Sequence, residues 1–177
     1  MVKCAKGESS RSKFLPYNIE EMINDKTCAV AYIIAPFFDE GIGLEKTIDI
    51  AHKNKLPVLL DAAAELPPRE NLTKFISLGV DAVGFSGGKG IGGPQSTGIL
   101  TGKREIMEAA KIHSFQNLHT TKSAIGRPMK VTKENIVGFI TALNLFIEDD
   151  VILEQNIWYK KAQKLKDIIN PKDGIII

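Results

Sequence analysis

The chain has 177 residues, of which 44% are hydrophobic and 25% are charged, and its formal net charge at pH 7 is +2. These values are typical of one globular domain with a sizeable core, and the small net charge argues against nucleic acid or an anionic membrane surface as a partner. Cys4 and Cys28 show neither metal-ligand spacing nor a disulfide framework, and His113 and His119 lack further ligands, so no metal site is predicted. No apolar run approaches the ~18 residues of a membrane span. We therefore expect a cytoplasmic protein without membrane contact.

Strands and helices alternate along the first part of the sequence. The polar residues 1–14 form a lead-in, and a helix over 19–24 starts at a cap formed by Asn18. An apolar run predicts a strand over 29–34. Apolar residues at helical spacing from Leu44 onward predict a helix after it.

A second unit of the same kind follows. Residues 56–60 form an apolar strand that is closed by Asp61, and a helix is predicted over 68–78. Residues 82–86 form the next strand. Because a strand, a helix and a strand joined by short loops form a right-handed parallel unit, the alternation predicts an α/β fold with a mostly parallel sheet flanked by helices.

The remaining chain predicts a short strand over 97–101, a helix over 103–112 and a long irregular stretch over 113–130. Thr132 caps an amphipathic helix. A last helix covers 151–169, and the final residues Gly-Ile-Ile-Ile have the pattern of a strand that has just begun. An unpaired apolar strand at the end predicts that the chain is incomplete.

Two polar side chains follow two successive strands of the predicted sheet. Asp61 closes one strand, and Lys89 lies in the glycine-rich turn after residues 82–86. Both positions are at the carboxyl ends of strands, the edge where open α/β sheets bind ligands. A carboxylate and an amine at that edge, with glycines that let backbone approach closely, suit an anionic cofactor that needs an amine.

Two nucleotide-binding motifs are excluded by their context. Residues 88–93 fit the pattern G-x-G-x-x-G and follow a strand, but Pro94 and a β-rich run come next where a dinucleotide site requires a helix. The same residues do not form a P-loop, because Gly90 stands in place of the required Ser or Thr and Val83 in place of the first glycine.

Each candidate side chain also has an ordinary structural explanation. Lys89 would then be a solvated lysine in a turn, and Asp61 a helix-capping carboxylate. Ser86 would be a turn-forming hydroxyl. Arg127, in the long loop before a helix, would be an exposed structural arginine.

Three motifs together resemble a known family. They are Asp-Ala-Ala at 61–63, Phe-Ser-Gly-Gly-Lys-Gly at 85–90 and Gly-Pro-Gln-Ser-Thr-Gly at 93–98. They look like the pyridoxal-phosphate enzymes of the aspartate aminotransferase fold (fold type I). Within them the chain is most similar to the branch of bacterial selenocysteine synthase and the D-glucosaminate-6-phosphate ammonia-lyases. The segment 125–131 resembles the lyase side of that branch, and the similarity runs over about 29–147.

The resemblance implies pyridoxal 5'-phosphate as the cofactor. Lys89 would form the Schiff base with it and then take and return the proton at the substrate α-carbon. Asp61 would keep the pyridine nitrogen protonated. Ala63, two residues further along an extended chain, would face the same way and pack against the ring.

Further residues are placed around the cofactor or substrate by the same resemblance. Ser86 would hold the cofactor phosphate, and Gln95 would add a contact to the cofactor. Arg127 has the bidentate fork that suits a carboxylate or phosphate of the substrate. The implied partners are a small amino compound as substrate and further copies of the chain in a homo-oligomer.

Proteins of this family are about twice as long, so the resemblance also implies a partial chain. Residues 15–130 would be the cofactor-binding portion of the large domain. Residues 131–177 would be helices that lead into an incomplete small C-terminal domain. Three functions stay open: a lyase acting on an amino acid or amino sugar acid, a selenium transferase acting on aminoacyl-tRNA, and a non-catalytic remnant or scaffold. The transferase would require a basic region that binds tRNA, and the net charge of +2 does not support such a region.

Overall fold

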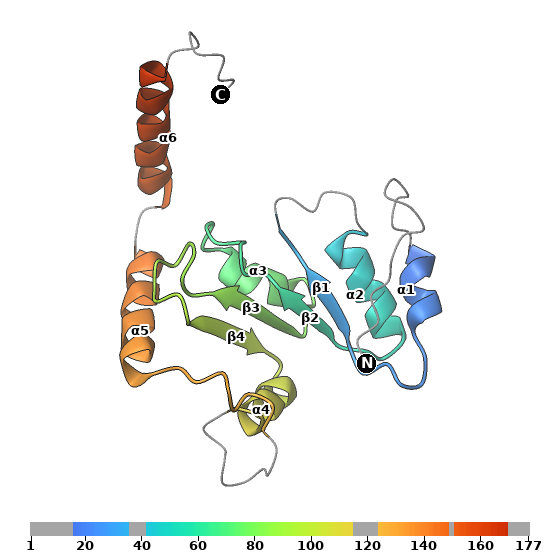
Figure 1. Ribbon diagram of the computed structural model, residues 1–177. Helices are drawn as coiled ribbons and strands as arrows, with labels where there is room; N and C mark the ends of the chain where they lie inside the picture. Colours follow the sequence, from blue (N-terminus) through green and yellow to red (C-terminus); the bar gives the residue numbers. More distant parts are fainter. Residues whose placement is uncertain (1–15, 36–41, 115–123, 149–150, 170–177) are drawn as a thin grey trace.

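The computed structural model describes residues 16–35, 42–114, 124–148 and 151–169 (Figure 1). In that part of the chain four strands form one sheet in the order β1-β2-β3-β4. The strands are β1 (Val30–Ile33), β2 (Val58–Asp61), β3 (Ala82–Ser86) and β4 (Gly98–Gly102).

The first three strands run parallel, and β4 runs antiparallel to β3. The predicted α/β fold with a mostly parallel sheet is therefore confirmed. The direction of β4 follows from its connection, since the link 87–97 contains no helix that could carry the chain back to the other end of the sheet. The chain instead reverses at the edge where β3 ends.

The described residues form six helices. They are α1 (Pro16–Met22), α2 (Leu44–Lys53), α3 (Asn71–Ser77), α4 (Arg104–Ile112), α5 (Lys133–Glu148) and α6 (Val151–Ile168).

The positions of the helices agree with the sequence predictions, but some boundaries differ. Helix α1 starts at Pro16, earlier than predicted, and proline is favoured in the first turn of a helix. Helix α3 starts later than predicted because residues 67–70 form bends and turns. Thr132 is confirmed as a cap, since its Oγ1 accepts a hydrogen bond of 3.2 Å from the backbone N–H of Asn135. The predicted final strand lies outside the described residues.

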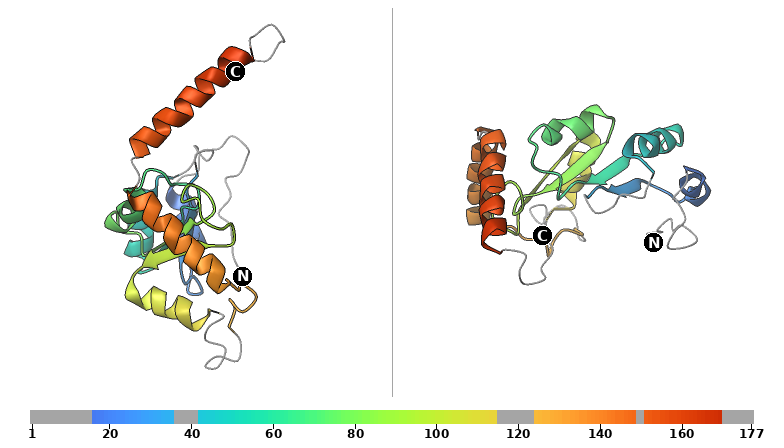
Figure 2. Two further views of the ribbon diagram at one scale, coloured as in Figure 1. Left: turned by 90° about the vertical axis from the view of Figure 1, so that its left-hand side faces the viewer. Right: turned by 90° about the horizontal axis from the view of Figure 1, so that it is seen from above.

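One face of the sheet carries the hydrophobic core. Along β2 the side chains alternate, so that Val58 and Leu60 are buried whereas Leu59 and Asp61 are exposed. The view from above in Figure 2 shows α2 and α3 on the same side of the sheet. The buried cluster unites β2, β3, α2 and α3 with one residue of α5, Phe146.

The opposite face of the sheet is more open in the described residues. Its apolar side chains Ile33, Leu59 and Leu100 are 58%, 37% and 51% exposed. Asp61 belongs to this face by the alternation of β2. Helix α5 lies at one end of the sheet, and α6 projects away from the other elements (Figures 1 and 2).

Candidate functional site

Asp61 is the last residue of β2 and lies opposite Gly84 of β3. Its Oδ1 accepts a hydrogen bond of 3.0 Å from the backbone N–H of Ala63. Its second oxygen, Oδ2, accepts no hydrogen bond from the described residues. Ala63 lies in a turn rather than in an extended chain, so its distance from the Asp61 carboxylate is set by this hydrogen bond and not by strand alternation.

Ser86 is the last residue of β3 and shares a face of the sheet with Asp61. Because strand side chains alternate and Gly84 pairs with Asp61, Ser86, two residues after Gly84, points to the same side. The Ser86 side chain is half-buried. Its hydroxyl forms no hydrogen bond with the part of the chain that the structure describes, so it is available to a ligand.

Lys89 lies in a closed loop just beyond the end of β3. The base of the loop is fixed by hydrogen bonds from Gly87 N to Thr97 O (2.9 Å) and from Gly93 N to Gly87 O (2.7 Å). A further bond of 2.9 Å joins Gly92 N to Lys89 O, and Gly92 adopts a φ of +73° that favours glycine. The Lys89 side chain is exposed, and its amine forms no ion pair within the described ranges.

The Lys89 loop packs against the turn that follows Asp61. A Cβ built on Gly90 would lie 2.6 Å from the carbonyl carbon of Leu66 and still closer to its oxygen. The turn itself is held by buried Asn71, whose Nδ2 donates a 2.6 Å hydrogen bond to Glu65 O. The structure therefore brings the segments that carry Asp61 and Lys89 into contact at one edge of the sheet.

Helix α5 supports the loop from a distant part of the sequence. A Cβ on Gly87 would lie 2.8 Å from Cδ2 of Phe139, so only glycine lets the ring approach this closely. Asn135 Nδ2 donates a 2.7 Å hydrogen bond to Ser96 Oγ. The sequence predicts an apolar face for α5 but no contact between this helix and the loop. The signal was present in the glycines, which mark close approach of backbone as well as turns.

Gln95 contacts the loop through its side chain. Its Nε2 donates a 2.8 Å hydrogen bond to the carbonyl oxygen of Gly88, the residue before Lys89. The Gln95 side chain is exposed. The residue that was expected to contact the cofactor thus lies beside Lys89 and holds its backbone.

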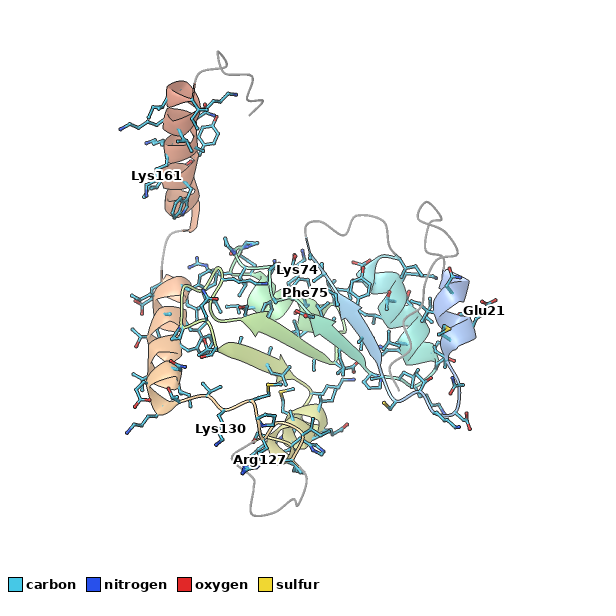
Figure 3. All side chains as sticks on the ribbon, in the orientation of Figure 1. Glu21, Lys74, Phe75, Arg127, Lys130 and Lys161 are labelled. Carbon is cyan, nitrogen blue, oxygen red and sulfur yellow. The ribbon has the colours of Figure 1, made fainter. Side chains whose placement is uncertain are left out.

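Arg127 lies on a separate segment beside α4, as does Lys130 (Figure 3). This segment is tied to the end of α4 by a 2.8 Å hydrogen bond from Gly126 N to His113 O. The Arg127 side chain is exposed. The structure therefore places Arg127 on a segment other than the Lys89 loop. The hydrogen bond to the end of α4 fixes the backbone of this segment.

A cavity of about 670 Å³ lies between this segment, the start of β4, α4 and α5. Its walls are mainly apolar, and two of its residues, Gly126 and Met129, flank Arg127 closely in sequence. The full lining is Thr97, Gly98, Ala110, His113, Ser114, Ile125, Gly126, Met129, Val131, Ile136 and Phe139. Because β4 starts where β3 ends, the cavity opens near the same edge of the sheet as the Lys89 loop.

A second polar cluster lies at the opposite edge and was missed by sequence analysis. Asp81 is buried. Its Oδ2 accepts a hydrogen bond of 2.7 Å from Val58 N, and the same oxygen lies 2.8 Å from His52 Nε2. Its Oδ1 lies 2.6 Å from Lys103 Nζ. Burial by itself raises the pKa of Asp81, but the hydrogen bonds from Lys103, Val58 and His52 together hold it below the ordinary value of 3.8.

The Asp81 cluster is structural. It joins the end of α2, the start of β2 and the end of β4, so it fixes how these elements meet. An aspartate directly before a buried strand was the available signal, because a buried carboxylate requires several donors. The positions of His52, Val58 and Lys103 in the sequence, however, give no indication that these residues contact the Asp81 carboxylate.

Comparisons with known proteins agree with this architecture. The sequence model of the family described as "SelA: L-seryl-tRNA selenium transferase" matches residues 23–169. A D-glucosaminate-6-phosphate ammonia lyase of Salmonella typhimurium is 33% identical over 129 residues, which cover 72% of this chain and 31% of the relative. An L-seryl-tRNA(Sec) selenium transferase of Aquifex aeolicus is 27% identical over 195 residues, covering 97% of this chain and 40% of the relative.

A solved structure of a D-glucosaminate-6-phosphate ammonia-lyase also matches, with a TM-score of 0.64 and 29% identity over 77% of this chain and 34% of that chain. The chain thus spans between 31% and 40% of the length of these three proteins. No helix among the described residues is both long and apolar enough to span a membrane. Since the family model covers most of the sequence, the chain belongs to the L-seryl-tRNA selenium transferase family.

Proposed function

We propose that this chain is the cofactor-binding portion of a pyridoxal-phosphate-dependent lyase that acts on an amino acid or amino sugar acid. The observation that carries the proposal is the contact between the Asp61 turn and the Lys89 loop at the ligand-binding edge of the sheet. Support comes from the family, whose members are pyridoxal-phosphate-dependent enzymes, and from the ammonia-lyase relative. The cytoplasm stays our predicted compartment.

The chemistry of the available groups fits pyridoxal 5'-phosphate. Asp61 offers a carboxylate oxygen that accepts no hydrogen bond from the described residues, which suits the protonated pyridine nitrogen. Ser86 offers a hydroxyl on the same face for the phosphate, Lys89 offers an amine for the aldehyde, and Ala63 and Gln95 would complete the cofactor wall. When bound, the cofactor would supply an electron sink for the carbanion formed at the substrate α-carbon.

Three residues of the chain would each have a defined part in the reaction. Lys89 would hold the cofactor through its Nζ and, once displaced by the substrate amine, would take the proton from the substrate α-carbon and return it. Asp61 would keep a negative charge beside the ring nitrogen. Arg127, which follows the cavity residue Gly126 in the sequence, would bind a carboxylate or phosphate of the substrate.

The amine of Lys89 is tested by covalent trapping on the full chain. Pyridoxal 5'-phosphate is added, the mixture is reduced with borohydride, and labelled lysines are located by peptide mass spectrometry. We expect label at Lys89 to exceed label at every other lysine and to vanish in Lys89→Ala. Lys74→Ala, which removes an exposed lysine of α3, is the matched control and should leave the Lys89 label unchanged.

Three results bear differently on the proposal. Equal total labelling of the native chain and Lys89→Ala would overturn the assignment of Lys89. No spectral change on addition of the cofactor would instead favour a non-catalytic remnant or scaffold. A normal Lys89 label in Asp61→Asn with undiminished cofactor affinity would remove Asp61 from the site, because the amide cannot carry the charge that the pyridine nitrogen needs.

Selenium transfer on aminoacyl-tRNA is the second candidate function. It is favoured by the family match and by the Aquifex relative, whose similarity extends over 97% of this chain. Binding of a seryl-tRNA in a gel-shift assay at physiological salt distinguishes the two candidates. A specific complex would favour the transferase, whereas the lyase predicts only weak and salt-sensitive retention.

A further inference from the structure

The peptide that joins Gly88 to Lys89 is held by the side chain of Gln95. The Nε2 of Gln95 donates a 2.8 Å hydrogen bond to the carbonyl oxygen of Gly88. The two backbones also touch, since a Cβ on Gly88 would lie 2.6 Å from the Cα of Gln95. No other hydrogen bond to this oxygen is formed by the described residues, so the orientation of the peptide depends on Gln95.

The other backbone hydrogen bonds of the loop do not involve the carbonyl group of Gly88. Gly93 N bonds to Gly87 O on one side of it, and Gly92 N bonds to Lys89 O on the other. Glycine at position 88 adds the widest range of backbone angles of any residue. Rotation of the Gly88–Lys89 peptide would turn the Cα–Cβ direction of Lys89, and with it the position of the amine.

We propose that Gln95 is a positioning residue that fixes the Gly88–Lys89 peptide and thereby aims the Lys89 amine at the edge of the sheet where Asp61 lies. The inference rests on the proposed function of Lys89. It gives Gln95 a role that is exerted through the carbonyl of Gly88 and not through contact with the cofactor phosphate. Displacements of about 1 Å at a reacting group are sufficient to change rates strongly.

The test uses the full chain, pyridoxal 5'-phosphate and borohydride, and measures label at Lys89 relative to label at Lys74 and Lys130 in the same sample. Gln95→Met keeps the length of the side chain and removes the donor. Gln95→Glu keeps its shape and replaces the amide by a group that cannot donate when ionised. The control is Ser96→Ala, which removes the neighbouring bond to Asn135 and leaves the bond to Gly88.

In both Gln95 variants we expect the relative Lys89 label to fall about five- to tenfold, the size of effect that follows from the loss of one hydrogen bond. Ser96→Ala should retain the native ratio. The midpoint of thermal unfolding should stay unchanged in all three variants, because Gln95 and Ser96 are exposed. The fall in labelling would then report the position of the amine and not general loss of folding.

A second aldehyde separates positioning from direct contact. Pyridoxal without its phosphate should show the same fall in the Gln95 variants. A fall confined to the phosphorylated form would identify Gln95 as a phosphate contact and overturn the positioning role. Unchanged Lys89 labelling in both variants would also overturn it while leaving the proposed function intact, whereas absence of selective Lys89 label in the native chain would overturn both.

Discussion

The carbonyl group of Leu66 occupies the space that a side chain on Gly90 would need. A Cβ there would lie 2.6 Å from the carbonyl carbon, a shorter distance than real Cβ atoms adopt. This contact joins two segments that are well separated in the sequence: the turn after Asp61, and the loop that carries Lys89. The relative position of the carboxylate and the amine therefore depends on a residue without a side chain.

Gly90→Ala should disturb this contact. The added methyl group meets backbone, which cannot move aside as a flexible side chain would, so the loop must shift. We expect a loss of about 1–3 kcal/mol in the free energy of unfolding, measured by urea denaturation. Gly84→Ala is the control, since the nearest atom to its Cβ, Leu100 Cδ1, is 4.0 Å away and the strand should be as stable or slightly more stable. Equal stability of the two variants would show that the loop does not pack on Leu66.

Asp81→Asn should destabilise the fold in a pH-dependent manner. The carboxylate accepts hydrogen bonds from Lys103, His52 and the backbone of Val58, and the amide cannot satisfy all of them. At pH 7 we expect a loss of about 1–3 kcal/mol by urea denaturation. Asp49→Asn, which alters an exposed aspartate of α2, should change the stability by less than about 0.5 kcal/mol.

The sign of the pH dependence follows from the direction of the pKa shift. The pKa of folded Asp81 lies below its ordinary value of 3.8, so the ionised carboxylate stabilises the fold fully above that value. The contribution is lost as the pH falls through the lower pKa of the folded state. The difference between the native chain and Asp81→Asn should therefore be largest near pH 7 and shrink below about pH 4. A difference that grew on acidification would contradict the assigned shift.

Two adjacent residues of α5 should respond in opposite ways to truncation. Phe146 is 6% exposed and belongs to the core, whereas Leu145 is 55% exposed. Phe146→Ala should cost about 3–5 kcal/mol of unfolding free energy, because it removes a buried ring and leaves a cavity. Leu145→Ala should stay within about 0.5 kcal/mol. Similar losses for both variants, again by urea denaturation, would show that α5 is covered on its second side.

The single tryptophan of the chain reports on α6. Trp158 is 60% exposed, and Lys161 Nζ lies 4.5 Å from the centre of its ring. Its fluorescence should be quenched readily by acrylamide, and Trp158→Ala should change the unfolding free energy by about 1 kcal/mol or less. Emission that resists the quencher in the folded chain would mean that another surface covers this side of α6.

Much of the fold follows from local sequence signals. Apolar runs and glycine or proline boundaries place β2, β3 and β4 within two residues, and the alternation with helices predicts parallel pairing. The placement of Asp61 and Lys89 at one edge follows from the same rule. The antiparallel direction of β4 is not fixed by any single residue, since it depends on how the link 87–97 folds back.

The supports of the site were beyond sequence reasoning for a physical reason. Phe139 contacts Gly87, and Lys103 contacts Asp81, through the tertiary fold and not through any spacing along the chain. The role of Ala63 shows the same limit, because the hydrogen bond from its N–H to Asp61 converts an expected extension of β2 into a turn. Side-chain hydrogen bonds of aspartate to nearby backbone compete with strand continuation in this way.

The bond from Val58 to Asp81 aligns the beginnings of β2 and β3. A shift of one residue in this pairing would send every side chain of β2 to the other face and carry Asp61 away from Ser86. The pairing at the start of β2 and β3 thus determines which side chains lie together where the two strands end. A screen for loss of cofactor binding should accordingly recover substitutions at both rims, including some that no ligand ever touches.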